Sequence, residues 1–281
     1  MQTFNQIAPL KTLVEQYKAD RLRVALVPTM GHLHQGHIHL IEYAKQIADK
    51  VVVSIFVNPL QFDRLEDLQN YPRSFKADQQ KLVEAQADIL FAPEESTMYP
   101  NGLDNPATVH VAGLSEALEG AKRPGHFLGV TTVVAKLFHI VQPDVACFGE
   151  KDFQQVAIIR RMCEELMLPV EIASVPIVRY DNGLAMSSRN SLLSAEQRAH
   201  APKLAQVLRW AGQQLASGLD ARQVSLETAQ KLNELDFKTD AIDIVDADSL
   251  TPLTQSSQRA VILAAAYLGK IRLIDNLVVK L

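Results

Sequence analysis

The sequence lacks the features that mark secreted, metal-binding and membrane proteins. It has two cysteines in 281 residues, Cys147 and Cys163, too few and too far apart for a disulfide framework or a zinc cluster. No apolar run approaches the roughly 18 residues that a membrane span needs. The first 20 residues have no apolar core behind a basic start, as a signal peptide would. We therefore expect a cytoplasmic protein whose two thiols are reduced and structural.

The sequence also has no excess of positive charge. Its 28 basic and 32 acidic side chains give a formal net charge of -4. No overall positive field would draw this surface to nucleic acid, so we expect neither a nucleic-acid nor a membrane partner. With 281 residues, 47% of them hydrophobic, the chain can build one large domain or two modest ones.

Apolar, β-branched runs alternate with helical periodicity through the first two thirds of the chain. We expect strands at 23–29, 50–59, 88–93, 107–111, 143–150 and 168–179, and helices at 37–50, 74–86, 129–142 and 152–166. Strands that are apolar on both faces and alternate with helices are typical of parallel sheets covered on both sides. The sequence thus predicts an α/β fold, a Rossmann-like doubly wound parallel sheet, for an N-terminal domain of residues 1–181.

The pattern changes after residue 181. Two helical stretches, near 194–216 and 221–234, precede strand-like runs, and the last two runs are joined closely enough around Gly269 and Lys270 for an antiparallel hairpin. Helices followed by consecutive strands predict a smaller α+β domain over residues 182–281, with the Asp181-Asn182-Gly183 turn as the hinge.

The stretch PTMGHLHQGHIHLI, residues 28–41, lies where the first strand gives way to a helix. The start of a helix offers N–H groups and partial positive charge to a phosphate, and Gly36 allows close approach of a ligand. His34 and His37, three residues apart, can face the same anion. The stretch is neither a Walker loop nor a dinucleotide fingerprint. The residues alone leave three readings open: phosphate binding, a metal pair for which no third ligand stands out, and structural histidines.

Two further clusters have the chemistry of nucleotide binding. In FGEKDFQQ, residues 148–155, Lys151 offers a point charge to phosphate, and Asp152 can cap the next helix or accept a sugar hydroxyl. In LAMSSRNSLLS, residues 184–194, two serines and Arg189 suit a polyphosphate. Each cluster alone is also ordinary turn composition. A nucleotide held between the two domains would contact all three clusters, so together they favour nucleotide binding.

The chain resembles the pantoate–β-alanine ligase family over essentially its whole length. Seven strings occur in that family's order and spacing: PTMGHLHQGH, FVNPLQF, YPR, RPGHF, VVAKLFHIVQPD, FGEKDFQQ and MSSRN. The family belongs to the cytidylyltransferase-like group of the HxGH superfamily. In this comparison residues 34–37 are the HxGH motif, and MSSR stands where related synthetases carry their KMSKS loop.

The resemblance implies an ATP-dependent ligase. The carboxylate of (R)-pantoate would attack the α-phosphorus of ATP, and the amine of β-alanine would then attack the pantoyl adenylate, giving pantothenate and AMP. It also implies ATP with Mg²⁺, small-molecule substrates as partners, and a homodimer. The sequence itself shows no dedicated carboxylate cage for the metal, so we expect no protein metal ligands. The alternative is another HxGH adenylyltransferase that acts on a small metabolite.

The resemblance further implies roles for particular residues. Catalytic roles fall to His34, His37, Lys151 and Arg189. Pantoate and β-alanine would be held by Gln61 and Gln155. The implied ATP-binding residues are Met30, Gly31, His34, Gly36, His37, Gly149, Glu150, Lys151, Asp152, Val178, Met186, Ser187, Ser188 and Arg189.

Overall fold

The computed structural model describes residues 1–281, which form two compact units. The N-terminal unit comprises Met1–Glu150 and Gln154–Pro176, and the C-terminal unit comprises Lys151–Phe153 and Ile177–Leu281. We expected the boundary at residue 181, whereas residues 177–181 group with the C-terminal unit. One reason is that Arg179 donates two hydrogen bonds, of 2.7 and 2.8 Å, to the buried carboxylate of Asp275.

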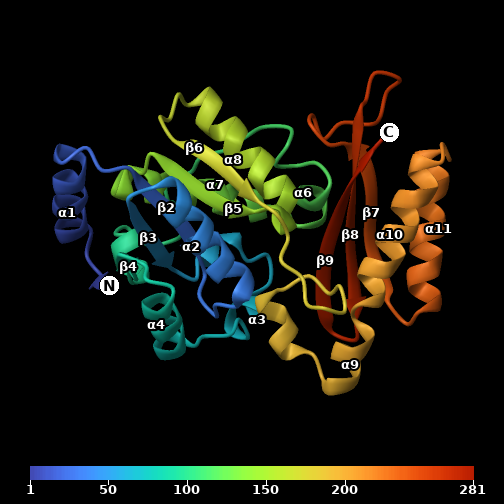
Figure 1. The fold of residues 1–281 in the computed structure, drawn as a ribbon, viewed down its shortest axis with the longest axis horizontal. Helices are drawn as coiled ribbons and strands as arrows, with labels where there is room; N and C mark the ends of the chain where they lie inside the picture. The colour runs from blue at the N-terminus through green and yellow to red at the C-terminus, as the bar shows by residue number, and fades with distance from the viewer. The chain divides into compact units, whose positions relative to one another are not determined.

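The N-terminal unit is built on a six-stranded sheet in the order β1-β4-β3-β2-β5-β6, and every pairing in it is parallel (Figure 1). The strands are β1 (Gln2–Phe4), β2 (Val24–Thr29), β3 (Lys50–Ile55), β4 (Ile89–Phe91), β5 (Val145–Gly149) and β6 (Glu171–Val175). From β2 the chain builds outward through β3 to β4, then crosses to β5 on the other side of β2. The sheet therefore reverses its building direction between β2 and β5.

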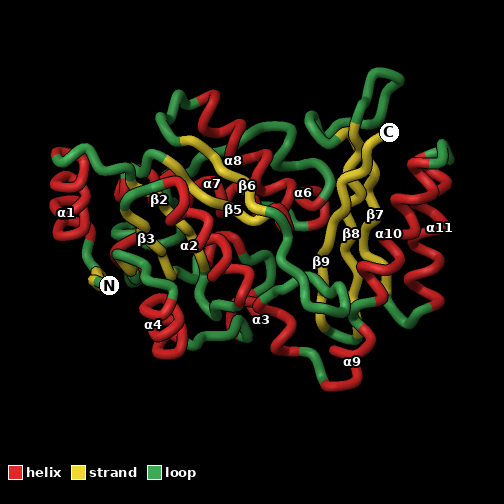
Figure 2. The backbone as a smooth tube through the Cα atoms, viewed as in Figure 1, coloured by secondary structure: helices red, strands yellow, loops and turns green.

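Helices cover both faces of this sheet (Figure 2). The longer ones are α1 (Ile7–Ala19), α2 (Gln35–Ile47), α4 (Phe75–Glu84), α7 (His126–Val141) and α8 (Phe153–Glu165). The short ones are η1 (Pro59–Gln61), α3 (Leu65–Gln69), α5 (Glu95–Met98), α6 (Glu119–Lys122) and η2 (Glu150–Asp152).

Strand β2 shows why the sheet needs two layers of helices. Val24 and Leu26 pack in one apolar cluster with α1, α7 and α8, whereas Ala25 and Val27 pack in another with α2 and α4. Successive residues of a strand point to opposite faces, so a strand that is apolar throughout must be covered on both sides. The predicted doubly wound α/β fold is confirmed.

The strand predicted at 107–111 is wrong. The backbone of Val109 instead bonds to side chains of α7: its N–H donates to Thr132 Oγ1 at 3.0 Å, and its carbonyl accepts from Thr131 Oγ1 at 2.6 Å. These hydroxyls satisfy the main chain that a sheet neighbour would otherwise satisfy. The sequence pattern was strand-like, but the segment has no strand beside it.

The C-terminal unit packs helices on a three-stranded antiparallel sheet, β7 (Lys238–Asp246), β8 (Arg259–Leu268) and β9 (Ile271–Lys280). The predicted hairpin is present, and Gly269 at its turn has φ +61°. The helices are η3 (Ser188–Leu192), α9 (Ala195–His200), α10 (Lys203–Ala216) and α11 (Ala221–Glu234). One helix was predicted over 194–216, but it is broken before Lys203 because Pro202 has no N–H to continue it. No helix in either unit is long and apolar enough to cross a bilayer.

Both cysteines are buried free thiols, as expected. Burial raises the pKa of Cys147 to about 12 and that of Cys163 to about 11, with a smaller contribution from Glu171 and Glu164 respectively. We predict that neither thiol reacts with a thiol-specific chromogenic reagent at pH 8 in the native protein, because reaction requires an accessible thiolate. Both should react once guanidinium unfolds the chain. Rapid modification of either cysteine without denaturant would contradict their placement in the core.

Candidate active site

The first predicted cluster lies at the carboxyl edge of the N-terminal sheet. Strand β2 ends at Thr29 and leads through residues 30–34 into α2, while its neighbour β5 ends at Gly149. These are the two strands between which the sheet reverses its building direction. In open α/β sheets, ligands bind beyond the carboxyl ends of the strands at this position. The topology therefore brings the ends of two predicted ATP-binding segments to one place.

The loop between β2 and α2 is held in a conformation that sequence patterns did not reveal. Gly31 and His32 have φ of +81° and +50°. A Cβ on Gly31 would lie 3.2 Å from the carboxylate of Asp78 and 3.1 Å from Ile55, so glycine suits both the turn and the close packing. The N–H of Gly31 donates to Thr29 Oγ1, which itself donates to the carbonyl of Ser54.

Helix α4 fixes this loop through two charged side chains. The buried carboxylate of Asp78 accepts hydrogen bonds from the N–H groups of His32 and Leu33, both at 2.8 Å, and from the hydroxyl of Ser74 at 3.2 Å. Three residues further along α4, Lys81 Nζ donates to the carbonyl of Leu33 at 2.6 Å. The main chain of Leu33 is thus bound at both its donor and its acceptor.

Asp78 was not among the residues predicted from the sequence. The signal was its place on the apolar face of α4, where it is the buried residue four positions before the buried Leu82. A carboxylate on that face requires hydrogen-bond donors from another element.

His34 and His37 lie at the N-terminus of α2 and cap it. His34 is the N-cap of α2, and its Nδ1 accepts from the N–H of Gly36 at 3.1 Å. His37 Nδ1 accepts from the N–H of His34 at 3.2 Å, and the two ring centroids are 4.1 Å apart. A neutral imidazole whose Nδ1 accepts must carry its proton on Nε2. Both rings are therefore set as Nε2–H donors at a helix N-terminus, an arrangement suited to phosphoryl oxygens.

Gln61 lies beyond the end of the next strand, β3, and its surroundings hold its main chain in place. Its carbonyl accepts from His126 Nδ1 at 2.7 Å and from Arg123 at 3.4 Å. Arg123 also pairs with Asp63 at 2.8 Å. Partial burial of Asp63 opposes its ionisation, but the charge and hydrogen bond of Arg123 outweigh this and lower the pKa of Asp63. Arg123 and His126 belong to the string RPGHF, so the structure gives that string a role in shaping the Gln61 turn.

The two glutamines of DFQQ differ in their surroundings. Gln154 is buried; its amide donates to the carbonyls of Leu114 and Ala117, and its oxygen accepts from the N–H of Glu119. Gln155 is half-buried and its side chain makes no hydrogen bond within the chain. Gln154 therefore has a packing role, and substrate binding by Gln155 stays a prediction.

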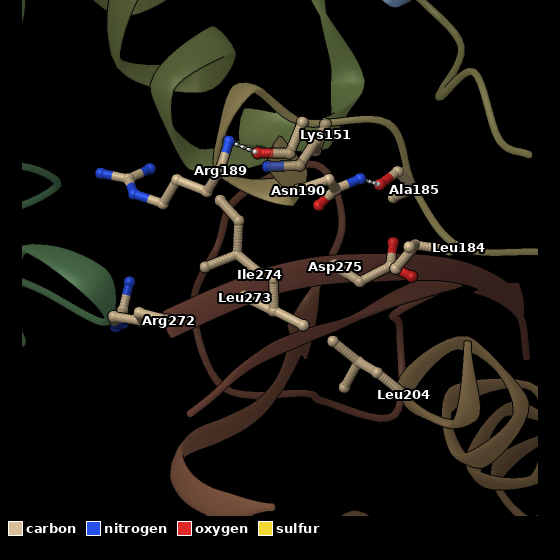
Figure 3. Close-up of a pocket in the computed structure, with 11 residues that line it drawn as sticks. Lys151, Leu184, Ala185, Arg189, Asn190, Leu204, Arg272, Leu273, Ile274 and Asp275 are labelled. Atoms are coloured by element: carbon tan, nitrogen blue, oxygen red, sulfur yellow. Dashed lines mark hydrogen bonds between the residues drawn. The ribbon is translucent and has the colours of Figure 1, made fainter. Parts of the chain in front are cut away.

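Of the other predicted residues, Met30 and Glu150 lie in the N-terminal unit. The C-terminal unit holds the predicted residues from Lys151 onward apart from Gln155, and three of them line one pocket (Figure 3). Lys151, Ser187 and Arg189 line it together with Arg272 and Asp275. Ser187 caps η3 by accepting from the N–H of Arg189 at 3.3 Å. Three basic residues and a serine thus line the pocket, a composition suited to phosphate. Of the charged lining residues, Arg272 pairs with Asp240 at 2.8 Å and Asp275 pairs with Arg179 at 2.7 Å.

Other contacts in this unit shape the loop at 184–194. Met186 N–H donates to the carbonyl of Val178 at 2.9 Å, so these two predicted ATP-binding residues are paired through the backbone. Asn190 donates to the carbonyl of Ala185 at 3.0 Å, as Figure 3 shows, while its buried Oδ1 has no protein donor. In neither unit do three or more His, Cys, Asp or Glu side chains form a group that could hold a metal ion.

Comparison with known proteins decides the family. The family model described as pantoate-beta-alanine ligase matches residues 2–278. The chain belongs to the pantoate–β-alanine ligase family. This match decides against the alternative of another HxGH adenylyltransferase.

Relatives in the family match the chain over its whole length. A pantothenate synthetase of Vibrio cholerae is 53% identical over 282 residues, covering 100% of this chain and 96% of the relative. One from Aeromonas hydrophila is 52% identical and covers 100% and 99%.

Solved structures of the family have the same fold. Pantothenate synthetase from Thermus thermophilus superposes with a TM-score of 0.91 at 43% identity and covers 99% of each chain. The enzyme from Francisella tularensis, described as complexed with β-γ ATP and β-alanine, gives a TM-score of 0.84 at 36% identity, covering 99% of this chain and 97% of that one.

The contacts of Asp78 lead to a testable prediction. In Asp78→Asn the amide has a single acceptor oxygen, so one of the two loop N–H groups loses its partner, at a cost of about 1–3 kcal/mol. We expect the KM for ATP to rise about tenfold or more. Asp88→Asn is the matched control, because Asp88 also accepts a backbone N–H, that of Val51 at 2.8 Å, and does not contact the loop. Equal KM values for ATP in both variants would show that Asp78 does not shape the ATP site.

Proposed function

We propose that this chain joins pantoate to β-alanine at the expense of ATP, through a pantoyl adenylate. Membership of the family supports the overall reaction, and the Francisella relative's complex with β-γ ATP and β-alanine supports two of the ligands. The observation that carries the chemistry is the pair of Nε2–H donors, His34 and His37, at the N-terminus of α2. Such a site binds phosphoryl oxygens and stabilises charge that develops on them.

In the first step an oxygen of the pantoate carboxylate bonds to the α-phosphorus of ATP, and the bond to the bridging oxygen of pyrophosphate breaks. In the second, the β-alanine nitrogen bonds to the acyl carbon, the bond to the AMP oxygen breaks and the amine loses a proton. A carboxylate is a poor acylating agent, so the adenylate supplies the leaving group. The protein mainly positions the reactants and stabilises phosphoryl charge.

We assign the binding residues within each unit as follows. In the N-terminal unit the proposed ATP-binding residues are Met30, Gly31, His34, Gly36, His37, Gly149 and Glu150. In the C-terminal unit they are Lys151, Asp152, Val178, Met186, Ser187, Ser188 and Arg189. Lys151 and Arg189 act as catalytic donors with the two histidines. Gln61 and Gln155 bind pantoate, and Gln61 also helps to place β-alanine.

Magnesium enters this proposal only as part of the MgATP substrate, whose phosphates and waters suit its octahedral preference. Resemblance to the family supports a homodimer. ATP as substrate and two free thiols are consistent with a cytoplasmic enzyme.

Pyrophosphate–ATP exchange tests the proposed function. We predict that labelled pyrophosphate enters ATP when pantoate and magnesium are present, and that β-alanine alone does not support exchange. His37→Ala should slow exchange by roughly 10²–10³-fold while the fold is retained, the effect of removing one preorganised donor. Exchange without pantoate, or none with it, would mean that the site activates a different acceptor.

A further inference from the structure

Consecutive hydrogen bonds link Tyr99 to Asn58 and Asn58 to Gln61. Neither Asn58 nor Tyr99 was among the residues predicted from the sequence. Asn58 follows β3 and is completely buried, and Tyr99 follows α5 and is 3% exposed. Tyr99 Oη donates to Asn58 Oδ1 at 2.6 Å. Asn58 Nδ2 donates to Gln61 Oε1 at 3.2 Å and to the carbonyl of Gly129 at 3.0 Å.

Each hydrogen bond that Asn58 makes has a fixed direction. The carbonyl of Gly129 can only accept, so it must face the NH₂ group of Asn58, and the Asn58 oxygen must face Tyr99. Burial raises the pKa of the Tyr99 hydroxyl to about 12, with a further contribution from Glu95, so the phenol keeps the proton it donates. Both N–H groups of Asn58 are occupied, and its amide has one orientation.

The orientation of Asn58 determines that of Gln61. Because Asn58 presents a donor, Gln61 must turn its oxygen towards Asn58 and its NH₂ group the other way. The Gln61 side chain is half-buried, and its Nε2 donates no hydrogen bond within the chain. Gln61 therefore presents two N–H donors to whatever ligand lies beside it.

Two other contacts hold Gln61 and Tyr99 in place. Gly129 of α7 lies against η1, where a Cβ would come within 2.4 Å of the carbonyl of Leu60 and 2.5 Å of the nitrogen of Gln61. Lys136 Nζ donates to the carbonyl of Met98 at 2.8 Å and lies 4.6 Å from the centre of the Tyr99 ring. The backbone of the Gln61 turn and the ring of Tyr99 are thus both fixed by α7.

We propose that Tyr99 is a positioning residue that acts through Asn58 to make Gln61 a hydrogen-bond donor, so that this subsite accepts a carboxylate or hydroxyl oxygen of the substrate. The inference rests on the proposed function, in which Gln61 binds pantoate. A carboxylate held by two N–H groups keeps its remaining lone pairs for attack. Tyr99 itself contacts no reacting atom.

The direction of donation is tested at Gln61. Gln61→Met keeps the size of the side chain and removes the donors, and Gln61→Glu can still accept from Asn58 but presents a negative oxygen to the substrate. We expect the KM for pantoate to rise in both variants and to rise at least tenfold more in Gln61→Glu, because like charges repel. If Gln61→Glu binds pantoate as well as Gln61→Met does, Gln61 is not a donor to an oxygen anion.

The role of Tyr99 is tested by a double-mutant cycle. Tyr99→Phe removes the donor to Asn58 Oδ1, and we expect the KM for pantoate to rise about 5- to 20-fold while the KM for ATP changes less than twofold, in line with a buried acceptor left unsatisfied. In the Gln61→Met background the same substitution should change the KM for pantoate less than twofold. Thr131→Val is the control. It removes a buried hydroxyl of α7 that donates to the carbonyls of Phe127 and Val109 and makes no hydrogen bond to Tyr99, Asn58 or Gln61.

The outcomes separate this inference from the proposed function. An equal effect of Tyr99→Phe in both backgrounds, or an effect no larger than that of Thr131→Val, would overturn the positioning role although the wild-type enzyme makes pantothenate. Failure of the wild-type enzyme to use pantoate at all would instead overturn the proposed function.

Discussion

The predicted histidine cluster of the N-terminal unit depends on one buried carboxylate. Asp78 has almost no access to solvent, and its carboxylate oxygens accept hydrogen bonds there from the N–H groups of His32 and Leu33. Those bonds fix the loop that leads from β2 into α2 and so determine where His34 starts the helix. Each histidine then accepts one backbone N–H at Nδ1, His34 from Gly36 and His37 from His34, which leaves the proton of each neutral ring on Nε2. A single carboxylate on α4 thus determines how two donors on α2 are presented.

The neighbouring subsite follows the same rule with neutral groups. Amides have distinct donor and acceptor ends, so a buried amide whose partners are fixed has one orientation. Tyr99, Asn58 and Gly129 orient Gln61 in this way through neutral groups alone. A neutral donor can hold a carboxylate while lowering its nucleophilicity less than a cation would. This gives a physical reason for glutamine at that position.

The sequence was informative where a residue's own chemistry or periodicity determines its place. Strand β2 is apolar on both faces, and that pattern requires a covered parallel sheet. His34 and His37 are three residues apart, a spacing that lets both face one anion at the start of a helix. Residues that act through others left weaker signals: Asp78 differs from any acidic helix residue only by its place on an apolar face, and Asn58 and Tyr99, 41 residues apart, meet only in the fold. The strand predicted at 107–111 was wrong because Thr131 and Thr132 bind its backbone.

The sequence also predicts that one nucleotide contacts all three clusters. This stays a prediction.

The central claim is that the site joins a carboxylate oxygen to the α-phosphorus of ATP. The most direct measurement uses pantoate labelled with ¹⁸O in both carboxylate oxygens and follows the label by mass spectrometry of the products. The account predicts one ¹⁸O in the phosphate of AMP, one retained in the amide of pantothenate, and none in pyrophosphate. Unlabelled AMP, or label in pyrophosphate or free phosphate, would show that the carboxylate is activated in another way and would contradict the account.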